Sequence, residues 1–432
     1  DMKQLIQTLT RMISDNPRVA LVQKKILKQL DPNDPLMEHQ HIKILWYEDR
    51  FNQMLKGNYT NIMPVNIELV PSLDCNLHCP HCTYRLWKER TKSEENRRQM
   101  KEEDIAPLLV AIEEAGVRGV TVTGGGEPFV NSNTITLLKC ASQKKFDTGV
   151  FTNGCLLDKD KISEIAELDL SFIRISINTA DEATYLKFHA VKDPTIFRSM
   201  IDHVGKLGEA LGKVNSKTNY GLAVVVNEDN VDEMLSVALL VRECFRKYKH
   251  FKLDYITYRP VVNYGQIDDN LNHQIAIATA KKAEENFQKT KEMLKDLPVR
   301  LKNANDYFHY ASQATRELQR GYEECIGHAW CASVAYDGGV YLCSERDGEL
   351  NYLMGNLKHA SFSDIWQSKQ RKEVVDHIKN CPPACKIHRT NLLLYSLLDN
   401  QTFDDNEIGE INIFLYVLRN AGQPEQLSFL SW

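Results

Sequence analysis

The 432-residue sequence has no apolar run long enough to cross a membrane. A spanning helix needs about 20 apolar residues, and the longest run here, LLLYSLL from Leu392, is far shorter. The stretch DMKQLIQTLTRMISD at the start also lacks the apolar centre of a signal peptide. We therefore expect a cytoplasmic protein with no membrane partner.

An excess of charge of one sign is missing as well. The chain carries 53 Lys and Arg against 58 Asp and Glu, a net charge of −5, so we expect no nucleic-acid partner. Hydrophobic residues make up 43% and charged residues 26% of the chain, which is typical of soluble globular proteins. The length suits one large domain with an appendage rather than one small core.

Strand and helix patterns alternate through the middle of the chain. Apolar residues follow a helical period up to residue 62, and a different rhythm begins at Val65. Six candidate strands, each followed by a candidate helix, predict an α/β protein with a parallel sheet and crossover helices. Functional residues should then lie at the carboxyl ends of the strands. The candidate strands are VNIELV, GVTVT, TGVFTNG, FIRISIN, YGLAVVVN and FKLDYITYRP.

The alternation stops after Pro260, and this sets the expected boundaries. A long helix, a second group of cysteines among short strands, and a helical tail come next. We expect an N-terminal helical segment at 1–62, the strand–helix unit at 63–262, a helical connector at 263–318, an α+β unit at 319–390 and a helical tail at 391–432.

The stretch SLDCNLHCPHCTYR places Cys75, Cys79 and Cys82 in one short polar turn. Disulfides are not expected in the reducing cytosol, so grouped thiols indicate a metal. A structural zinc site uses four ligands, and only His78 and His81 stand nearby as a fourth. A [4Fe–4S] cluster also takes four thiolates as a rule. Three thiolates therefore leave one iron open to another ligand.

This C-x3-C-x2-C spacing, together with TGGGEP at Thr123–Pro128 after the second strand, resembles the radical S-adenosylmethionine (SAM) superfamily. The resemblance implies a partial (β/α)6 TIM-like barrel in which Cys75, Cys79 and Cys82 bind a [4Fe–4S] cluster whose open iron chelates SAM. It also implies that one electron from the reduced cluster cleaves SAM to a 5′-deoxyadenosyl radical, which abstracts a substrate hydrogen. A flavodoxin or ferredoxin is the expected electron donor.

The same resemblance assigns SAM contacts to the ends of three strands. Glycines let the backbone approach a ligand because they carry no Cβ, and the glutamate after them can meet the SAM ammonium. FTNG and RISIN end the third and fourth strands, where the family places ribose and carboxylate contacts. The candidate contacts are Gly124, Gly125, Gly126, Glu127, Asn153 and Ser176.

A second group of five cysteines spans residues 325–385. It resembles the C-terminal SPASM extension of radical SAM enzymes, or its shortened twitch form, with a strand hairpin around an Asp-Gly turn and then a helix, SFSDIWQSKQRKEVVDHI. The resemblance implies one auxiliary [4Fe–4S] cluster, although four thiolates also suit zinc. The expected ligands are Cys325, Cys343, Cys381 and Cys385.

Cys331 is then left over beside Trp330. One interpretation is a buried thiol, and a second is a further cluster ligand. In a third, Cys331 is catalytic, because the family's peptide epimerases use a cysteine to return a hydrogen atom to a substrate radical. The redox chemistry of cysteine suits the thiyl that this donation leaves.

The resemblance implies an enzyme that abstracts hydrogen from an unactivated C–H bond. The first hypothesis is an epimerase of a ribosomally made peptide, with Cys331 as hydrogen donor. The alternative is a twitch-type dehydrogenase that oxidises an aminocyclitol or sugar alcohol, with the auxiliary cluster accepting an electron. A purely electron-transferring iron–sulfur protein is a further hypothesis, but it leaves the three-cysteine loop and GGGEP unexplained.

Overall fold

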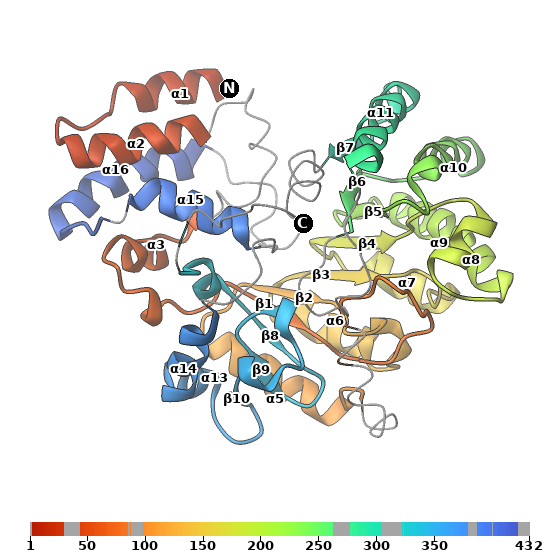
Figure 1. The fold of residues 1–432 in the computed structure, drawn as a ribbon, viewed down its shortest axis with the longest axis horizontal. Helices are drawn as coiled ribbons and strands as arrows, with labels where there is room; N and C mark the ends of the chain where they lie inside the picture. The colour runs from red at the N-terminus through yellow and green to blue at the C-terminus, as the bar shows by residue number, and fades with distance from the viewer. Residues whose placement is uncertain are drawn as a thin grey trace.

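The computed structural model shows one large sheet, helices along its outer face and a separate helical layer (Figure 1). The helices that follow the strands fan out on one side of the molecule, whereas both ends of the described chain meet on the other. The structure describes residues 2–29, 44–84, 87, 98–261, 277–303, 322, 324–378, 387–399 and 401–421.

The sheet is parallel over most of its width. Strands β1 to β7 are neighbours in chain order and all run parallel. β8 pairs with the other edge of β1, also in parallel, and β9 and β10 follow in antiparallel pairs. The strands are β1 (Asn66–Leu69), β2 (Gly119–Val122), β3 (Asp147–Thr152), β4 (Phe172–Ser176), β5 (Asn219–Val226), β6 (Tyr255–Pro260), β7 (Arg300–Asn303), β8 (Cys331–Val334), β9 (Gly339–Tyr341) and β10 (Leu353–Asn356).

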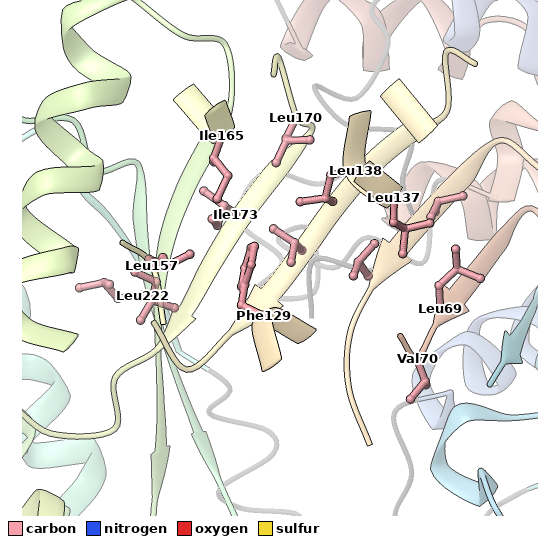
Figure 2. Close-up of a cluster of buried hydrophobic side chains, with 14 of the residues drawn as sticks. Leu69, Val70, Phe129, Leu137, Leu138, Leu157, Ile165, Leu170, Ile173 and Leu222 are labelled. Atoms are coloured by element: carbon pink, nitrogen blue, oxygen red, sulfur yellow. The ribbon is translucent and has the colours of Figure 1, made fainter. Parts of the chain in front are cut away.

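The crossover helices cover the outer face of the sheet through buried aliphatic side chains. Ile173 and Leu222 of the strands are 0% exposed and share one cluster with Leu137 and Ile165 of the helices (Figure 2). Successive strand residues point to opposite faces, so Arg174 lies on the inner face. The predicted α/β fold is confirmed. These helices are α5 (Glu102–Glu114), α6 (Thr134–Gln143), α7 (Lys159–Glu167), α8 (Glu182–Phe188), α9 (Pro194–Lys213), α10 (Met234–Lys247) and α11 (Ile277–Leu294).

In the segment expected to be a helical connector, 263–318, the described residues 277–303 are only partly helical. It contains α11, but Arg300–Asn303 form β7 by pairing with Tyr255–Tyr258 of β6. This strand extends the parallel sheet beyond the six strands that the sequence predicts. Its four residues are too few for a periodic pattern to identify, and the pairing partner decides their structure.

The helix predicted over 361–378 is two helices, α13 (Phe362–Gln367) and α14 (Lys369–His377). Ser368 between them has an extended backbone, with ψ of 159°. Its hydroxyl accepts a hydrogen bond from the N–H of Arg371, so it caps α14. A serine inside a helical pattern was the signal for this break.

Both ends of the described chain build a second hydrophobic core. Helices α1 (Met2–Thr10), α2 (Pro17–Gln29) and α3 (Glu48–Leu55) lie with α15 (His388–Leu398) and α16 (Asp405–Ala421), as Figure 1 shows. Ile26, Leu394 and Leu415 are 0% exposed in this core. The helical segments predicted at the two ends are present, but they form one unit. No helix in the described ranges is both long and apolar enough to cross a bilayer.

Candidate active site

The grouped cysteines Cys75, Cys79 and Cys82 lie in the loop after β1, at the carboxyl edge of the parallel strands. All three thiols are partly exposed. Among the residues that the structure describes, no three Cys, His, Asp or Glu side chains lie close enough together to hold a metal ion. The Sγ of Cys79 contacts Nδ1 of His189 at 3.0 Å. Three accessible thiols from one loop nevertheless fit an iron–sulfur cluster with one iron free of thiolate.

The glycine-rich loop after β2 packs directly on the cysteine loop. The N–H of Gly126 donates to the carbonyl oxygen of Ser72 at 2.9 Å, and the N–H of Glu127 donates to that of Asp74 at 2.8 Å. A Cβ added at Gly126 would lie 2.0 Å from the Asp74 oxygen. The close approach that the sequence assigned to a ligand is therefore made by the protein's own cysteine loop, and only glycine permits it.

Replacing Gly126 with alanine is expected to push the two loops apart. Overpacking of this kind costs about 1–3 kcal/mol of the free energy of unfolding, and the displaced loop should bind less iron. The control is Gly409→Ala in α16, where an added Cβ meets nothing within 4 Å and should stabilise by about 0.5–1 kcal/mol. Urea unfolding and iron content measure both effects. Equal stability and iron content for Gly126→Ala and wild type would contradict the loop contact.

Glu127 joins the second and third strands. Its side chain is 2% exposed and accepts hydrogen bonds from the N–H of Phe129 at 3.1 Å, the hydroxyl of Thr152 at 2.6 Å and the N–H of Asn153 at 2.7 Å. Burying a carboxylate is costly unless donors surround it, and these three donors meet that need. Glu127 therefore fixes the end of β3 relative to the cysteine loop, a role that the sequence did not predict.

Asn153 also contacts the cysteine loop. Its amide Nδ2 donates to Oδ1 of Asn76 at 2.8 Å, and its Oδ1 accepts from the N–H of Cys155 at 2.9 Å. Ser176, the other candidate, ends β4 and is half-buried. The structure thus brings Glu127 and Asn153 together around the cysteine loop and leaves Ser176 at the next strand end. Their contacts with SAM remain predictions.

His189 is a further residue at this edge. It caps the end of α8, is buried, and contacts Cys79 through Nδ1 and Asn178 Nδ2 through Nε2 at 3.4 Å. Burial, together with the nearby His81, lowers the pKa of His189 to about 3. The imidazole is therefore neutral at physiological pH.

The inner face of the sheet is polar. Glu68 of β1 and Arg174 of β4 are each 4% exposed, although the outer residues beside them are apolar. The Arg174 guanidinium lies 3.9 Å above the ring of Phe151, and its Nε and Nη1 have no hydrogen-bond partner in the described structure. Burial lowers the pKa of Arg174 to about 10; Tyr255 and Glu68 raise it, and Arg259 lowers it further. Two cations thus lie near each other inside the sheet.

Cys331 begins β8, which pairs with β1 so that Cys331 is the partner of Asn66. It therefore lies on the inner face with Glu68, roughly 10 Å along β1 from the end that carries the cysteine loop. The antiparallel register of β8 and β9 pairs Ser333 with Tyr341. β9 ends at Tyr341, two residues before Cys343, so an extension of this register by two residues would pair Cys331 with Cys343.

The predicted Asp-Gly turn joins β8 and β9, with Gly338 at φ +88°. Cys325 and Cys343 are partly exposed, and the Sγ of Cys325 accepts from Asn391 Nδ2 at 3.2 Å. Cys381 and Cys385 lie outside the described residues. The auxiliary ligand set therefore stays a prediction.

Sequence reasoning missed Asn76, Thr152, Asn178 and His189. Thr152 and Asn178 stand in FTNG and RISIN, so their positions at strand ends were a usable signal. Asn76 lies between two of the cysteines. His189 carried no signal, because its contact with Cys79 depends on how α8 packs.

Comparison with known proteins agrees with this architecture. Residues 69–241 match the radical SAM superfamily, and residues 325–387 match the SPASM iron–sulfur cluster-binding domain. Both matches cover the parts of the chain that carry the two cysteine groups.

Curated relatives are distant in sequence. Fe-coproporphyrin III synthase of Methanosarcina barkeri is 22% identical over 328 residues, which cover 73% of this chain and 76% of that protein. PqqA peptide cyclase of Bradyrhizobium diazoefficiens is 28% identical over 120 residues, 28% of this chain and 30% of that protein.

Among solved structures, SuiB of Streptococcus suis bound to its precursor peptide SuiA superposes with a TM-score of 0.54 at 14% identity, over 84% of this chain and 75% of SuiB. SuiB has also been solved with SAM bound. The chain therefore belongs to the radical SAM superfamily, carries a SPASM-type iron–sulfur domain after its barrel, and has SAM and [4Fe–4S] clusters as its cofactors.

Proposed function

We propose that this enzyme abstracts a hydrogen atom from a residue of a ribosomally made peptide. The cluster and SAM, when bound, supply the 5′-deoxyadenosyl radical, and a flavodoxin or ferredoxin supplies the electron. The observation that carries the proposal is the docking of the Gly126 loop on the cysteine loop. This contact holds the cysteine loop at the carboxyl edge of the parallel strands, where a substrate can reach it.

Two comparisons support a peptide as the substrate. SuiB, which shares the fold over most of this chain, is bound to a precursor peptide, and one curated relative is named a peptide cyclase. The counterexamples among the relatives include the porphyrin synthase and probable GTP 3′,8-cyclases. We therefore base the choice of substrate class also on the charges of the inner face.

The inner face favours a substrate that carries an anionic group. Nε and Nη1 of the buried Arg174 have no hydrogen-bond partner in the described structure. Arg259 lies close enough to lower the Arg174 pKa, whereas Glu68 supplies one carboxylate to offset the two cations. Buried cations are costly unless an anion pairs with them. A carboxylate from an acidic side chain of the peptide supplies that charge, whereas a cationic aminocyclitol or an uncharged sugar alcohol does not.

Replacing Arg174 with methionine is expected to stabilise the substrate-free enzyme. The change removes two buried nitrogens without hydrogen-bond partners, each of which costs about 1–3 kcal/mol, and methionine can keep the contact with the Phe151 ring. Urea unfolding measures the effect. Arg198→Met is the control, because Arg198 is exposed and its replacement should change stability by less than about 0.5 kcal/mol. A clear loss of stability in Arg174→Met would show that Arg174 is structural.

Epimerisation is the net reaction that we place first, and it requires a free thiol at Cys331. The place of Cys331 on the inner face, away from the cysteine loop, supports a donor on the far side of the substrate. An extension of the β8–β9 register past Tyr341 to Cys343 is the argument for the other role that the sequence left open, a ligand of the auxiliary cluster. In that case the substrate radical is converted to product by cross-linking or oxidation.

The function is tested by co-expressing the enzyme with each short open reading frame beside its gene, in normal water and in D2O. In one peptide we expect either a mass change in normal water, or no mass change in normal water and one added deuterium per modified residue in D2O. The purified, reduced enzyme should cleave SAM in a parallel assay. SAM cleavage without any peptide modification, together with deuterium transfer from a labelled aminocyclitol to 5′-deoxyadenosine, would establish the dehydrogenase instead.

A further inference from the structure

His189 lies between a cysteine of the cluster loop and the end of β4. Its Nδ1 is 3.0 Å from the Sγ of Cys79, and its Nε2 is 3.4 Å from Nδ2 of Asn178. Its backbone carbonyl oxygen also accepts from the N–H of His78 at 3.1 Å. The residue therefore contacts the cysteine loop through both its ring and its main chain.

The surroundings of Asn178 decide which ring nitrogen carries the proton. Oδ1 of Asn178 accepts from the N–H of Val225 at 2.9 Å, so the amide NH2 is the end that faces His189. An amide NH2 only donates, and Nε2 of His189 must accept. In a neutral imidazole the proton then sits on Nδ1, which points at Cys79.

The structure holds Asn178 in this orientation. It has a left-handed backbone, with φ of +60°, and its carbonyl oxygen accepts from Nδ2 of Asn230 at 3.0 Å. Asn178 is 4% exposed and His189 is 2% exposed, so water does not compete readily for these bonds. The donor aimed at Cys79 is therefore fixed before any ligand binds.

We propose that His189 is a positioning residue that donates its Nδ1 hydrogen to the Cys79 thiolate and makes the bound cluster easier to reduce. Hydrogen bonds to the sulfurs of a cluster are one of the factors that set its reduction potential. Reduction adds negative charge that the sulfurs share, so a donor stabilises the reduced form more than the oxidised form. The inference rests on the proposed function, because it needs the cluster at the Cys75 loop.

The test is the reduction potential of that cluster, followed by electron paramagnetic resonance (EPR) in the complete enzyme. The signal of the open-iron cluster is the one that changes when SAM is added. His189→Phe keeps a ring of similar size without a donor and should shift the reduction equilibrium about tenfold toward the oxidised form, which is about 59 mV for one electron. His189→Gln, which keeps an N–H donor, should recover most of the wild-type reduction potential.

His203→Phe is the matched control. His203 also bonds through Nδ1, at 2.8 Å, but to the carbonyl oxygen of Gly154, and its replacement should leave the potential unchanged. An unshifted potential in His189→Phe with unchanged iron content would overturn the proposal.

A second measurement tests the proposal if the His189→Phe variant does not retain its iron. Pulsed EPR of wild-type enzyme labelled with 15N-histidine should detect a nitrogen coupled to the SAM-sensitive cluster. Absence of that coupling overturns the proposal without any variant. Absence of a SAM-sensitive signal in wild type would instead contradict the cluster assignment, so the two failures are distinguishable.

Discussion

An enzyme with Cys75, Cys79 and Cys82 all replaced by alanine is expected to lose SAM cleavage entirely and to keep about four irons per chain, against about eight in wild type. The three thiols come from one loop and offer the open iron that SAM needs, whereas the described cysteines of the second group, Cys325, Cys331 and Cys343, lie in and around the β8–β9 hairpin on the other side of β1. Iron and sulfide analysis under anaerobic conditions, with a 5′-deoxyadenosine assay, measures both effects.

The control for this variant is Cys140→Ala, because Cys140 belongs to α6 and to neither group. It should keep the iron and the cleavage of wild type. Loss of all iron from the triple variant would leave no auxiliary cluster, and the cysteines of 325–385 would then need explanation as zinc ligands or buried thiols. Retained SAM cleavage would contradict the assignment of the first loop.

Cys331→Ala is expected to keep about eight irons per chain and to keep SAM cleavage, but to lose the incorporation of solvent deuterium into the peptide product. The expectation follows from the place of Cys331 on the inner face of the sheet, away from the cysteine loop, where a thiol can return a hydrogen atom to a substrate radical. The measurement is iron content together with the deuterium content of the product formed in D2O.

The opposite result would contradict the epimerase. If the variant instead loses iron toward about four per chain, together with the EPR signal that does not respond to SAM, Cys331 is a ligand of the auxiliary cluster. Cys244→Ala serves as the control, since Cys244 is buried in α10 away from both groups. It should retain iron and deuterium incorporation.

The barrel was predictable because its periodic signals are local. In β4, Ile173 faces the helices and Arg174 faces inward, and such alternation is visible in the sequence itself. The cysteine and glycine loops were also placed correctly at strand ends. β8 was identified as a strand, but nothing local indicates that it joins the sheet beside β1, which lies far away in the chain.

The missing parts of the site have the same cause. His189 and Asn178 act through contacts across different loops, and a histidine after a short helix resembles any other polar residue. Glu127 was selected as a SAM contact, which stays a prediction, and the structure adds a role that the sequence did not indicate, since three donors of the chain itself hold its carboxylate. A sequence motif identifies which residues matter more readily than what each one touches.

The core shared by the two ends of the described chain imposes an order on folding during synthesis. Val19, Val22 and Ile26 of α2 are buried in a core with helices that the ribosome produces long after α2. Until α15 and α16 emerge, these side chains lack the partners that those helices supply, and exposed apolar helices of this kind invite chaperones and aggregation. Contacts so distant in sequence also form slowly. A chain interrupted before α15 would therefore hold all the strands of the sheet and an unfolded beginning.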